Sequence, residues 1–231
     1  MNNMKKKNTP HYIGHRNRLR KRFMNHGIES LQEYEVVELL LTFSIPYKDV
    51  KPIAKELISK FKSLKGIIDA PVEELKKVKY VKDKTIELIK FIKEISIYYQ
   101  KQKAQEIPIS KTHDELVDYC IKKMGDKKDE EFRVISLDSN LSMIADDLIS
   151  QGTIDKAFVY PRKIMESALK NKAYAIILVH NHPDGKLEPS EYDINVTKAL
   201  EIPAKVLGLL IYDHLIISSN GYFSFKKEGL L

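Results

Sequence analysis

The segment that most constrains the fold is AYAIILVH, residues 173–180, which is almost entirely apolar and ends in a histidine. An apolar run of this kind is typical of a central strand that is covered on both faces. Helices must then pack on the sheet, because each layer buries its apolar face against another. The segment therefore predicts a domain of the α/β or α+β class.

The segments around this strand alternate between helical and extended patterns. Ser139 and Asn140 lie between two strand-like segments and predict the turn that joins them. Pro161 stands where it can open a helix. Residues 205–218 predict two adjacent strands, and residues 221–225 predict an edge strand. The predicted helices are 113–125, 161–170 and 189–201, and the other predicted strands are 131–138, 142–150 and 156–161.

The first part of the chain has a different pattern, which is helical throughout. Short amphipathic segments with tight connections predict a small all-α domain over residues 15–100. Residues 1–14 predict a flexible basic arm, and the polar residues 101–110 predict a linker to a mixed domain over 111–231. The predicted helices of the all-α domain are 31–43, 49–61, 63–70, 71–78 and 84–99.

The composition excludes some classes of protein. The hydrophobic content of 43% is enough to form cores, so global disorder is not expected. No apolar run reaches the roughly 18 residues that cross a bilayer, and the basic N-terminus lacks the apolar stretch of a secretory signal, so we expect no membrane partner. Cys120 is the only cysteine, which excludes an internal disulfide and fits a reducing compartment. We therefore expect a cytoplasmic protein.

The net charge of +7 is unevenly distributed along the chain. Residues 1–110 carry 23 basic and 13 acidic side chains, whereas residues 111–231 carry 16 and 19. Eight basic residues precede the first acidic residue, Glu29. This asymmetry favours a first part that binds a polyanion. The alternative is that a lysine-rich composition only keeps the protein in solution.

Two histidines, separated by one residue, lie at the end of the apolar run. In an extended segment, residues two apart point the same way, so His180 and His182 can present their rings to one point. The Pro-Asp-Gly turn at 183–185 reverses the chain, and a helix that begins near Ser190 brings back Asp193. Two imidazole nitrogens, one carboxylate oxygen and a water are the ligands of a catalytic zinc site. The pattern therefore indicates one zinc ion per chain, which lowers the pKa of its water towards ~7.

Simpler interpretations stay open beside the metal site. A pair of histidines near a turn is often incidental. Ser190 and Asp193 also fit a capping box, S-x-x-D, which needs no metal. Asp213 and His214 lie in an apolar strand, where they form either a satisfied structural pair or a pair that supports the metal ligands.

The combined pattern H-x-H, seven residues, S, two residues, D resembles the metal signature of JAMM (MPN/Mov34) metalloprotease domains. Within that fold the chain is similar to the RadC family, also called UPF0758. The similarity is carried by YPRKIMESAL at 160–169, ILVHNHPDG at 177–185, PSEYD at 189–193 with Thr197, and LGLLIYDHLIIS at 207–218, and it covers essentially the whole chain. It implies a cytidine-deaminase-like mixed sheet with flanking helices, and it implies that His180, His182 and Asp193 bind zinc.

The resemblance also implies a glutamate at the start of the first sheet strand that acts as general acid and base. Glu130 and Glu131 are the candidates, and they point to opposite faces of an extended strand, so only one can act. Family members place the glutamate two residues before the residue that is Phe132 here, which selects Glu130. Ser190 is implied to stabilise the oxyanion of a tetrahedral intermediate.

The first part of the chain resembles a helix-hairpin-helix domain found in the same family. Such hairpins often carry Gly-x-Gly, which lets backbone N–H groups approach a DNA phosphate. Tyr80, Val81 and Lys82 stand there instead, so the backbone is not expected to come close. Lys82 and Lys84 would contact phosphates by charge alone, in a salt-sensitive and sequence-blind way. The other expected DNA contacts are the cluster Arg16, Arg18, Arg20, Lys21 and Arg22.

These observations lead to three hypotheses for the function. The first is a zinc-dependent hydrolase of the JAMM type, which cleaves a peptide or isopeptide bond in an unidentified peptide or protein and associates with DNA non-specifically. The second is a DNA-associated protein without enzymatic activity. The third is a metal-dependent nuclease or deaminase, but deaminases usually have cysteine ligands and a glutamate inside H-x-E, and here Asn181 and His182 follow His180. The first hypothesis is favoured.

Overall fold

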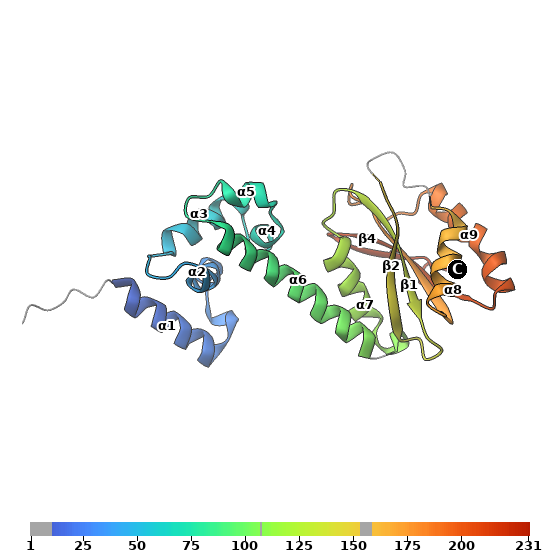
Figure 1. Ribbon diagram of the computed structural model, residues 1–231, viewed down its shortest axis with the longest axis horizontal. Helices are drawn as coiled ribbons and strands as arrows, with labels where there is room; N and C mark the ends of the chain where they lie inside the picture. The colour runs from blue at the N-terminus through green and yellow to red at the C-terminus, as the bar shows by residue number, and fades with distance from the viewer. Residues whose placement is uncertain (1–10, 107, 153–158) are drawn as a thin grey trace, which may run out of the picture. The chain divides into compact units, whose positions relative to one another are not determined.

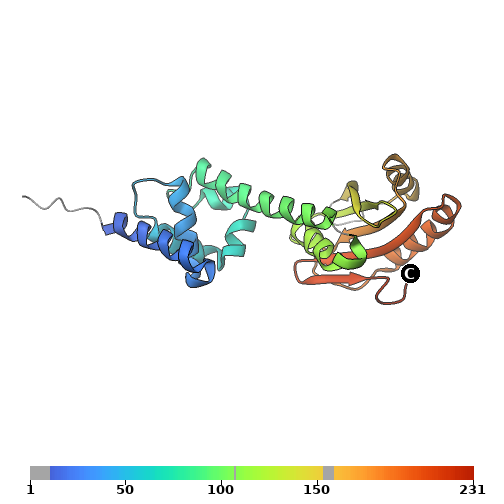
Figure 2. The ribbon, with the colours of Figure 1, turned by 90° about the horizontal axis from the view of Figure 1, so that it is seen from below.

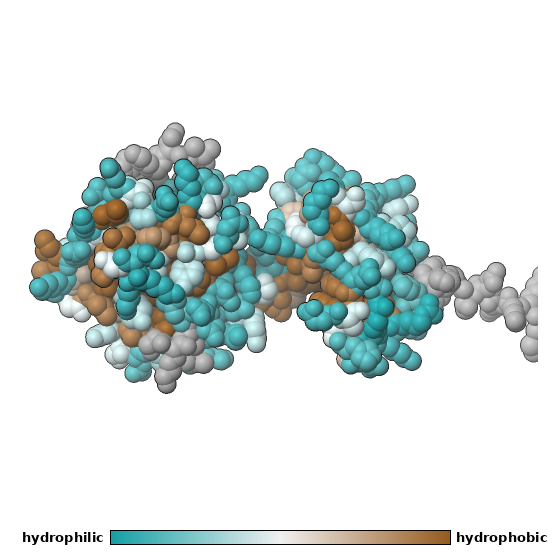
Figure 3. All heavy atoms as spheres, turned by 180° about the vertical axis from the view of Figure 1, so that it is seen from behind, coloured by the Kyte–Doolittle hydropathy of each residue, from teal (hydrophilic) through white to brown (hydrophobic). Residues whose placement is uncertain are grey.

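The computed structural model describes residues 11–106, 108–152 and 159–231. The chain divides into two compact units, Met1–Ile95 and Ser96–Leu231, and both are drawn in Figures 1 and 2. On the face shown in Figure 3, apolar patches lie between hydrophilic residues in each unit. None of the described helices combines the length and the apolar character that a membrane span requires.

The first unit is helical, as the sequence predicts. Helix α1 already begins at His11, so the predicted arm is wrong for residues 11–14, and residues 1–10 lie outside the described part of the chain. The capping box of α2 is built by Gln32 and Glu35. The elements are α1 (His11–His26), a 3-10 turn (Ile28–Ser30), α2 (Glu33–Ser44), α3 (Lys51–Phe61), α4 (Leu64–Asp69), α5 (Val72–Lys76) and α6 (Asp83–Glu106), and the last of these runs on into the second unit.

The segment that was predicted as a linker, 101–110, is helical on both sides of residue 107. Helix α6 continues to Glu106, and α7 begins at Ile109 directly after Pro108. The prediction of a linker relied on the polar character of the segment. Residues 101–106 read KQKAQE, and these residue types are good helix formers, so polarity alone was a poor guide here.

The second unit is built around a five-stranded mixed sheet, which confirms the predicted α+β class. The strand order is β2-β1-β3-β4-β5, and β3 is parallel to β4 while the other pairs are antiparallel. All seven residues of β3 are buried, as expected for the central strand of 173–180. The elements are α7 (Ile109–Met124), β1 (Glu130–Leu137), β2 (Met143–Gly152), α8 (Pro161–Lys170), β3 (Ala175–Asn181), α9 (Glu191–Val206), β4 (Leu210–Ser218) and β5 (Gly221–Ser224).

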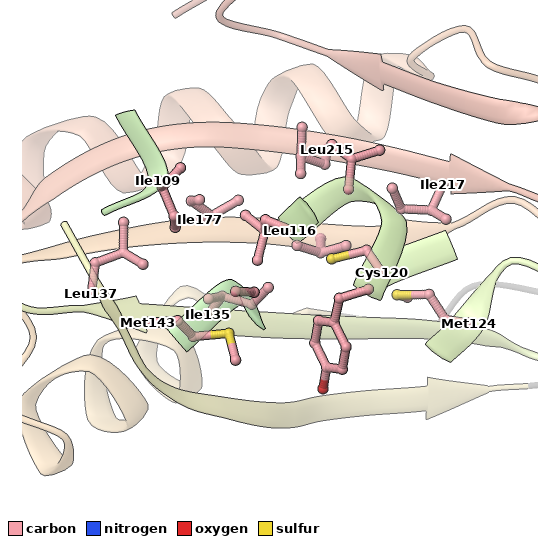
Figure 4. Packing of buried hydrophobic residues seen from close by; sticks show 14 of the residues in the cluster. Ile109, Leu116, Cys120, Met124, Ile135, Leu137, Met143, Ile177, Leu215 and Ile217 are labelled. Atoms are coloured by element: carbon pink, nitrogen blue, oxygen red, sulfur yellow. The ribbon is translucent and has the colours of Figure 1, made fainter. Parts of the chain in front are cut away.

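Each face of the sheet has its own apolar core. Ile177 and Val179 of β3 pack with α7 in one cluster, part of which is shown in Figure 4. Ile176 and Leu178 pack with α8 and α9 in the other cluster. Because side chains alternate along a strand, His180 belongs to the α9 face together with Ile176 and Leu178.

One predicted pair of strands is wrong, and half of another predicted strand falls outside the described residues. Residues 205–218 contain a single strand, β4, because α9 continues through Pro203 to Val206 and the chain turns at Gly208, where φ is +67°. The apolar residues on both sides of Gly208 fit a strand as well as a helix, so the sequence did not indicate where the helix ends. Residues 156–158 of the predicted strand at 156–161 lie outside the described part of the chain. Val159 and Tyr160 are not in a strand, and Pro161 begins α8.

Candidate metal centre

His180 and His182 lie where the central strand leaves the sheet. The His180 side chain is completely buried, and its ring stacks on Phe132 of β1 with 5.8 Å between centroids and an interplanar angle of 7°. The backbone N–H of His182 donates to the Ile217 carbonyl at 2.9 Å, so β4 still holds the chain at this point. The two rings face each other, with 3.0 Å between their Nε2 atoms.

Asp193 reaches the two histidines from the first turn of α9. Ser190 is the N-cap of that helix, and the Asp193 carboxylate accepts hydrogen bonds from the Ser190 backbone N–H at 2.7 Å and from its hydroxyl at 2.6 Å. Both oxygens of the carboxylate also lie near an imidazole. Asp193 Oδ1 lies 3.2 Å from His180 Nε2, and Asp193 Oδ2 lies 3.7 Å from His182 Nε2. The capping box and the cluster of possible ligands therefore coexist, and one does not replace the other.

The three side chains fit a small divalent cation in their spacing. Zinc binds nitrogen and oxygen at about 2.0–2.1 Å in a tetrahedron, whose corners are then about 3.3 Å apart. Two of the separations, 3.0 Å between the imidazole nitrogens and 3.2 Å from His180 Nε2 to Asp193 Oδ1, lie near that value. Taken with one atom from each residue, the three possible ligand atoms lie within 4.8 Å of one another. Among the described residues, His180, His182 and Asp193 form a group of side chains that can hold a metal ion.

The hydrogen bond that His182 makes through Nδ1 leaves its Nε2 available to bind a metal ion. Its Nδ1 lies 3.0 Å from the Lys186 carbonyl, which can only accept, so Nδ1 carries the hydrogen and the neutral ring presents the lone pair of Nε2 to His180 and Asp193. Two nitrogens and a carboxylate that converge in this way can be satisfied by a positive charge between them, either a proton or a metal ion. Burial lowers the pKa of His182, but the hydrogen bond and charge of Asp193 outweigh burial and raise it. Burial raises the pKa of Asp193, but the two imidazoles outweigh burial and hold it well below its ordinary value.

The two candidate glutamates separate as the alternation of β1 requires. Glu131 is buried on the α7 face, where it forms ion pairs with Lys127 and, at 3.2 Å, with Arg133. Glu130 is half-buried and lines the cleft beside His182, where its charge contributes to the raised pKa of that ring. Asn181 helps to fix this end of the strand, because its Oδ1 accepts the Glu131 backbone N–H at 2.8 Å. The geometry favours Glu130 as the group that faces the site.

An open cleft leads to the cluster. Its volume is about 530 Å³. Ser190 lies on its wall, but the hydroxyl hydrogen is donated to Asp193, so in this structure Ser190 orients the carboxylate of Asp193. Its implied role towards an oxyanion stays a prediction. The cleft is lined by Lys128, Glu130, His182, Pro183, Asp184, Lys186, Glu188, Pro189 and Ser190.

Asp213 and His214 do not act as a pair of side chains, because they point to opposite faces of β4. The Asp213 carboxylate accepts from the Ser224 hydroxyl at 2.6 Å and from the Lys226 N–H at 3.0 Å. His214 instead lies 3.0 Å from His180, on the α9 face. Burial, followed by the charge of His180, lowers the pKa of His214 well below its ordinary value. The sequence singled out the residue, but its contact with His180 depends on the register between β3 and β4.

The arginine cluster of the first unit is divided between internal and exposed positions. Arg16 donates to the carbonyls of Ile45, at 3.0 Å, and Lys48, and Arg22 forms an ion pair with Glu35. Arg20 lies 3.4 Å from the Thr42 hydroxyl. Arg16, Arg20 and Arg22 therefore help to fix α1 on its neighbours. Arg18 and Lys21 are exposed on α1.

The hairpin before α6 keeps an unusual backbone although it lacks glycine. Tyr80 has φ of +69°, a left-handed conformation in which glycine is the usual residue. The Lys48 ammonium lies over the Tyr80 ring. Lys82 and Lys84 lie beside this turn and line a cleft of about 430 Å³ with Tyr80. This turn therefore has a left-handed residue at a position that is not glycine.

Comparison with known proteins agrees with this geometry. Residues 110–230 match the family described as the RadC-like JAB domain, and this stretch contains the whole cluster. The chain is also 40% identical over 225 residues to the UPF0758 protein FN0909 of Fusobacterium nucleatum subsp. nucleatum. That similarity covers 94% of this chain and 97% of the relative, so it includes the helical first unit.

Proposed function

The chain belongs to the RadC family (UPF0758), and we propose that it is a zinc-dependent hydrolase that cleaves a peptide or isopeptide bond with an activated water. The observation that carries the proposal is the convergence of His180, His182 and Asp193, whose possible ligand atoms lie within 4.8 Å of one another, next to an open cleft. His180, His182 and Asp193 would hold the ion. When bound, zinc supplies a Lewis acid and a water whose pKa falls to about 7.

The side chains around the cluster have complementary parts in this reaction. Glu130 faces the cleft, so its carboxylate accepts a proton from the attacking water and returns it to the leaving amine. The new bond joins the water oxygen to the carbonyl carbon, and the bond to the amine nitrogen breaks. Ser190 holds the Asp193 carboxylate through its hydroxyl hydrogen. For Ser190 to stabilise the developing oxyanion, this hydrogen turns from Asp193 to the cleft, whose wall Ser190 lines.

The metal content of purified protein tests the proposal. We expect about one zinc per wild-type chain, and strong loss in His182→Ala and in Asp193→Ala, because three protein ligands are the minimum of a catalytic site. Asp184→Ala is the matched control, since Asp184 is a carboxylate on the wall of the same cleft and lies outside the cluster. Equal metal content in all four proteins would refute the proposal.

Hydrolysis itself is tested with the presumed base. Glu130→Gln should retain zinc and lose cleavage of a mixed peptide library by a factor of about 10² to 10⁴, as expected for removal of a general base. Full cleavage by Glu130→Gln would remove Glu130 from the mechanism. Zinc binding with no cleavage of peptides or isopeptide-linked proteins by the wild type would favour the non-enzymatic alternative.

A second proposal is that the first unit binds DNA without sequence preference. The hairpin at Tyr80 supports it, because the turn keeps its left-handed residue and places Lys82 and Lys84 beside the N-terminus of α6. The measurement is duplex affinity as a function of salt. We expect Lys82→Gln together with Lys84→Gln to reduce the log–log salt slope by about 1.8, at about 0.9 per lost phosphate contact. The charge-matched control is Lys198→Gln with Lys205→Gln on α9, which should bind as the wild type does.

A further inference from the structure

His214 connects the presumed zinc ligand His180 to Thr197 of α9. His214 is completely buried on β4, and its Nε2 lies 3.0 Å from His180 Nδ1. Its Nδ1 lies 2.7 Å from the Thr197 hydroxyl oxygen, and Thr197 is also buried. The Thr197 oxygen in turn lies 2.8 Å from the backbone carbonyl of Asp193. A continuous chain of hydrogen bonds therefore runs from one presumed ligand to the backbone of another.

The direction of these bonds follows from counting hydrogens. The Asp193 carbonyl has no hydrogen to give, so the only hydrogen for its 2.8 Å contact is that of the Thr197 hydroxyl. A threonine has a single hydroxyl hydrogen, and the Thr197 oxygen must therefore accept in its 2.7 Å contact with His214. The hydrogen of that contact lies on His214 Nδ1.

The same reasoning fixes His180. The ring of His214 is completely buried and stacks on Phe225 with 4.5 Å between centroids, and such an apolar environment disfavours the charged form of an imidazole. A neutral ring with hydrogen on Nδ1 has a lone pair on Nε2, so His214 Nε2 accepts and His180 Nδ1 donates. His180 then carries its lone pair on Nε2, the atom that faces His182 and Asp193.

We propose that Thr197 and His214 are positioning residues, which fix the tautomer of His180 so that its Nε2 is ready to bind the metal. The inference rests on the proposed function, because it takes His180 as a ligand. The Lys186 carbonyl, in the loop that follows β3, fixes the tautomer of His182 in the same way. The two ligand rings are thus oriented by separate parts of the chain, one by a surface loop and one by a buried relay. Hydrogen-bond partners of this kind typically change metal affinity 10- to 100-fold.

Zinc affinity of threonine variants tests the relay. Thr197→Val has the same shape and no hydroxyl, and we expect it to bind zinc 10- to 100-fold more weakly in competition with a chelator. Thr197→Ser keeps the hydroxyl and should bind within about threefold of the wild type. Thr42→Val is the matched control, because Thr42 is a buried helical threonine of the first unit whose hydroxyl also donates to a backbone carbonyl, that of Leu39 at 2.7 Å. Equal affinity of Thr197→Val and wild type would overturn the inference while the proposed function stands.

The tautomers themselves can be read by ¹⁵N NMR of the imidazole nitrogens in the metal-free protein, at a pH where both ligand rings are neutral. We expect His180 and His214 each to carry hydrogen on Nδ1 in the wild type, and His180 to lose this preference in Thr197→Val. Hydrogen on His180 Nε2 in the wild type would overturn the relay. This measurement needs no zinc and no activity. Failure of the wild type to bind zinc, with the expected tautomers present, would refute the proposed function alone.

Discussion

Glu130 and Glu131 are neighbours with the same side chain, so their amide variants give a controlled comparison of a group at the site and a group in the core. The Glu131 side chain is 3% exposed and lies between Lys127 and Arg133. Glu130 is half-buried at the cleft. We predict that Glu131→Gln destabilises the second unit and leaves zinc binding unchanged. Glu130→Gln should leave stability unchanged within about 0.5 kcal/mol, as for substitutions away from such buried features.

The magnitude for Glu131 follows from the partners that remain. Removal of one partner of a fully buried ion pair costs about 3–5 kcal/mol. Arg133 keeps a second partner, Asp146, at 2.7 Å, and the Lys127 side chain is 38% exposed and can be solvated. We therefore expect about 2–3 kcal/mol, below the range for a pair that is left wholly unpaired.

Hydrogen exchange of the β3 amides is the suitable assay, because the chain has two compact units and a single global transition cannot be assumed. A loss of about 2–3 kcal/mol accelerates exchange roughly 30- to 150-fold, at tenfold per 1.4 kcal/mol. The reasoning is refuted if Glu131→Gln exchanges as slowly as the wild type, or if Glu130→Gln exchanges faster than Glu131→Gln.

Further predictions concern the cores and the hairpin. Burial and the nearby Asp146 raise the pKa of Cys120, so the native protein should not react with a thiol reagent, and reaction in native buffer faster than unfolding would contradict its placement. Leu116→Ala, in the cluster of Figure 4, should cost about 2–5 kcal/mol in the same exchange assay, and a cost below 1 kcal/mol would speak against that core. Tyr80→Gly should be more stable than Tyr80→Ala by about 1 kcal/mol in amide exchange of the helices of the first unit, because only glycine relieves the positive φ; equal exchange rates would argue against a left-handed residue there.

Much of the second unit could be predicted from the sequence because its strongest signals are local. The apolar run at 173–180 predicts a central strand, and Pro161 marks the start of α8. The end of α9 could not be predicted in this way. Lys205 and Val206 fit a strand as well as a helix, and the helix continues through Pro203, a residue that usually marks a break.

The candidate site was predictable only where its residues are close in sequence. His180, His182 and Asp193 are brought together by a strand end, a turn and one helical turn, so spacing alone indicates their convergence. His214 and Thr197 are 17 residues apart and meet because β4 lies parallel to β3 beneath α9. The pairing of residues between β3 and β4 cannot be predicted from a local sequence pattern. For the same reason, the sequence did not show that Arg16 and Arg22 are occupied by contacts within their own unit.

The hydrogen bond between His182 and the Lys186 carbonyl links occupation of the cleft to the orientation of a possible metal ligand. Lys186 belongs to the wall of the cleft, so an occupant that displaces this carbonyl also releases the ring that it orients. In the proposed metal-bound state, such an occupant would lower the affinity for the cation, and by thermodynamic reciprocity the cation would lower the affinity for that occupant by the same factor. The metal-bound protein would therefore prefer molecules that bind in the cleft without moving this loop. The Lys186 carbonyl would in this way contribute to the specificity of the cleft.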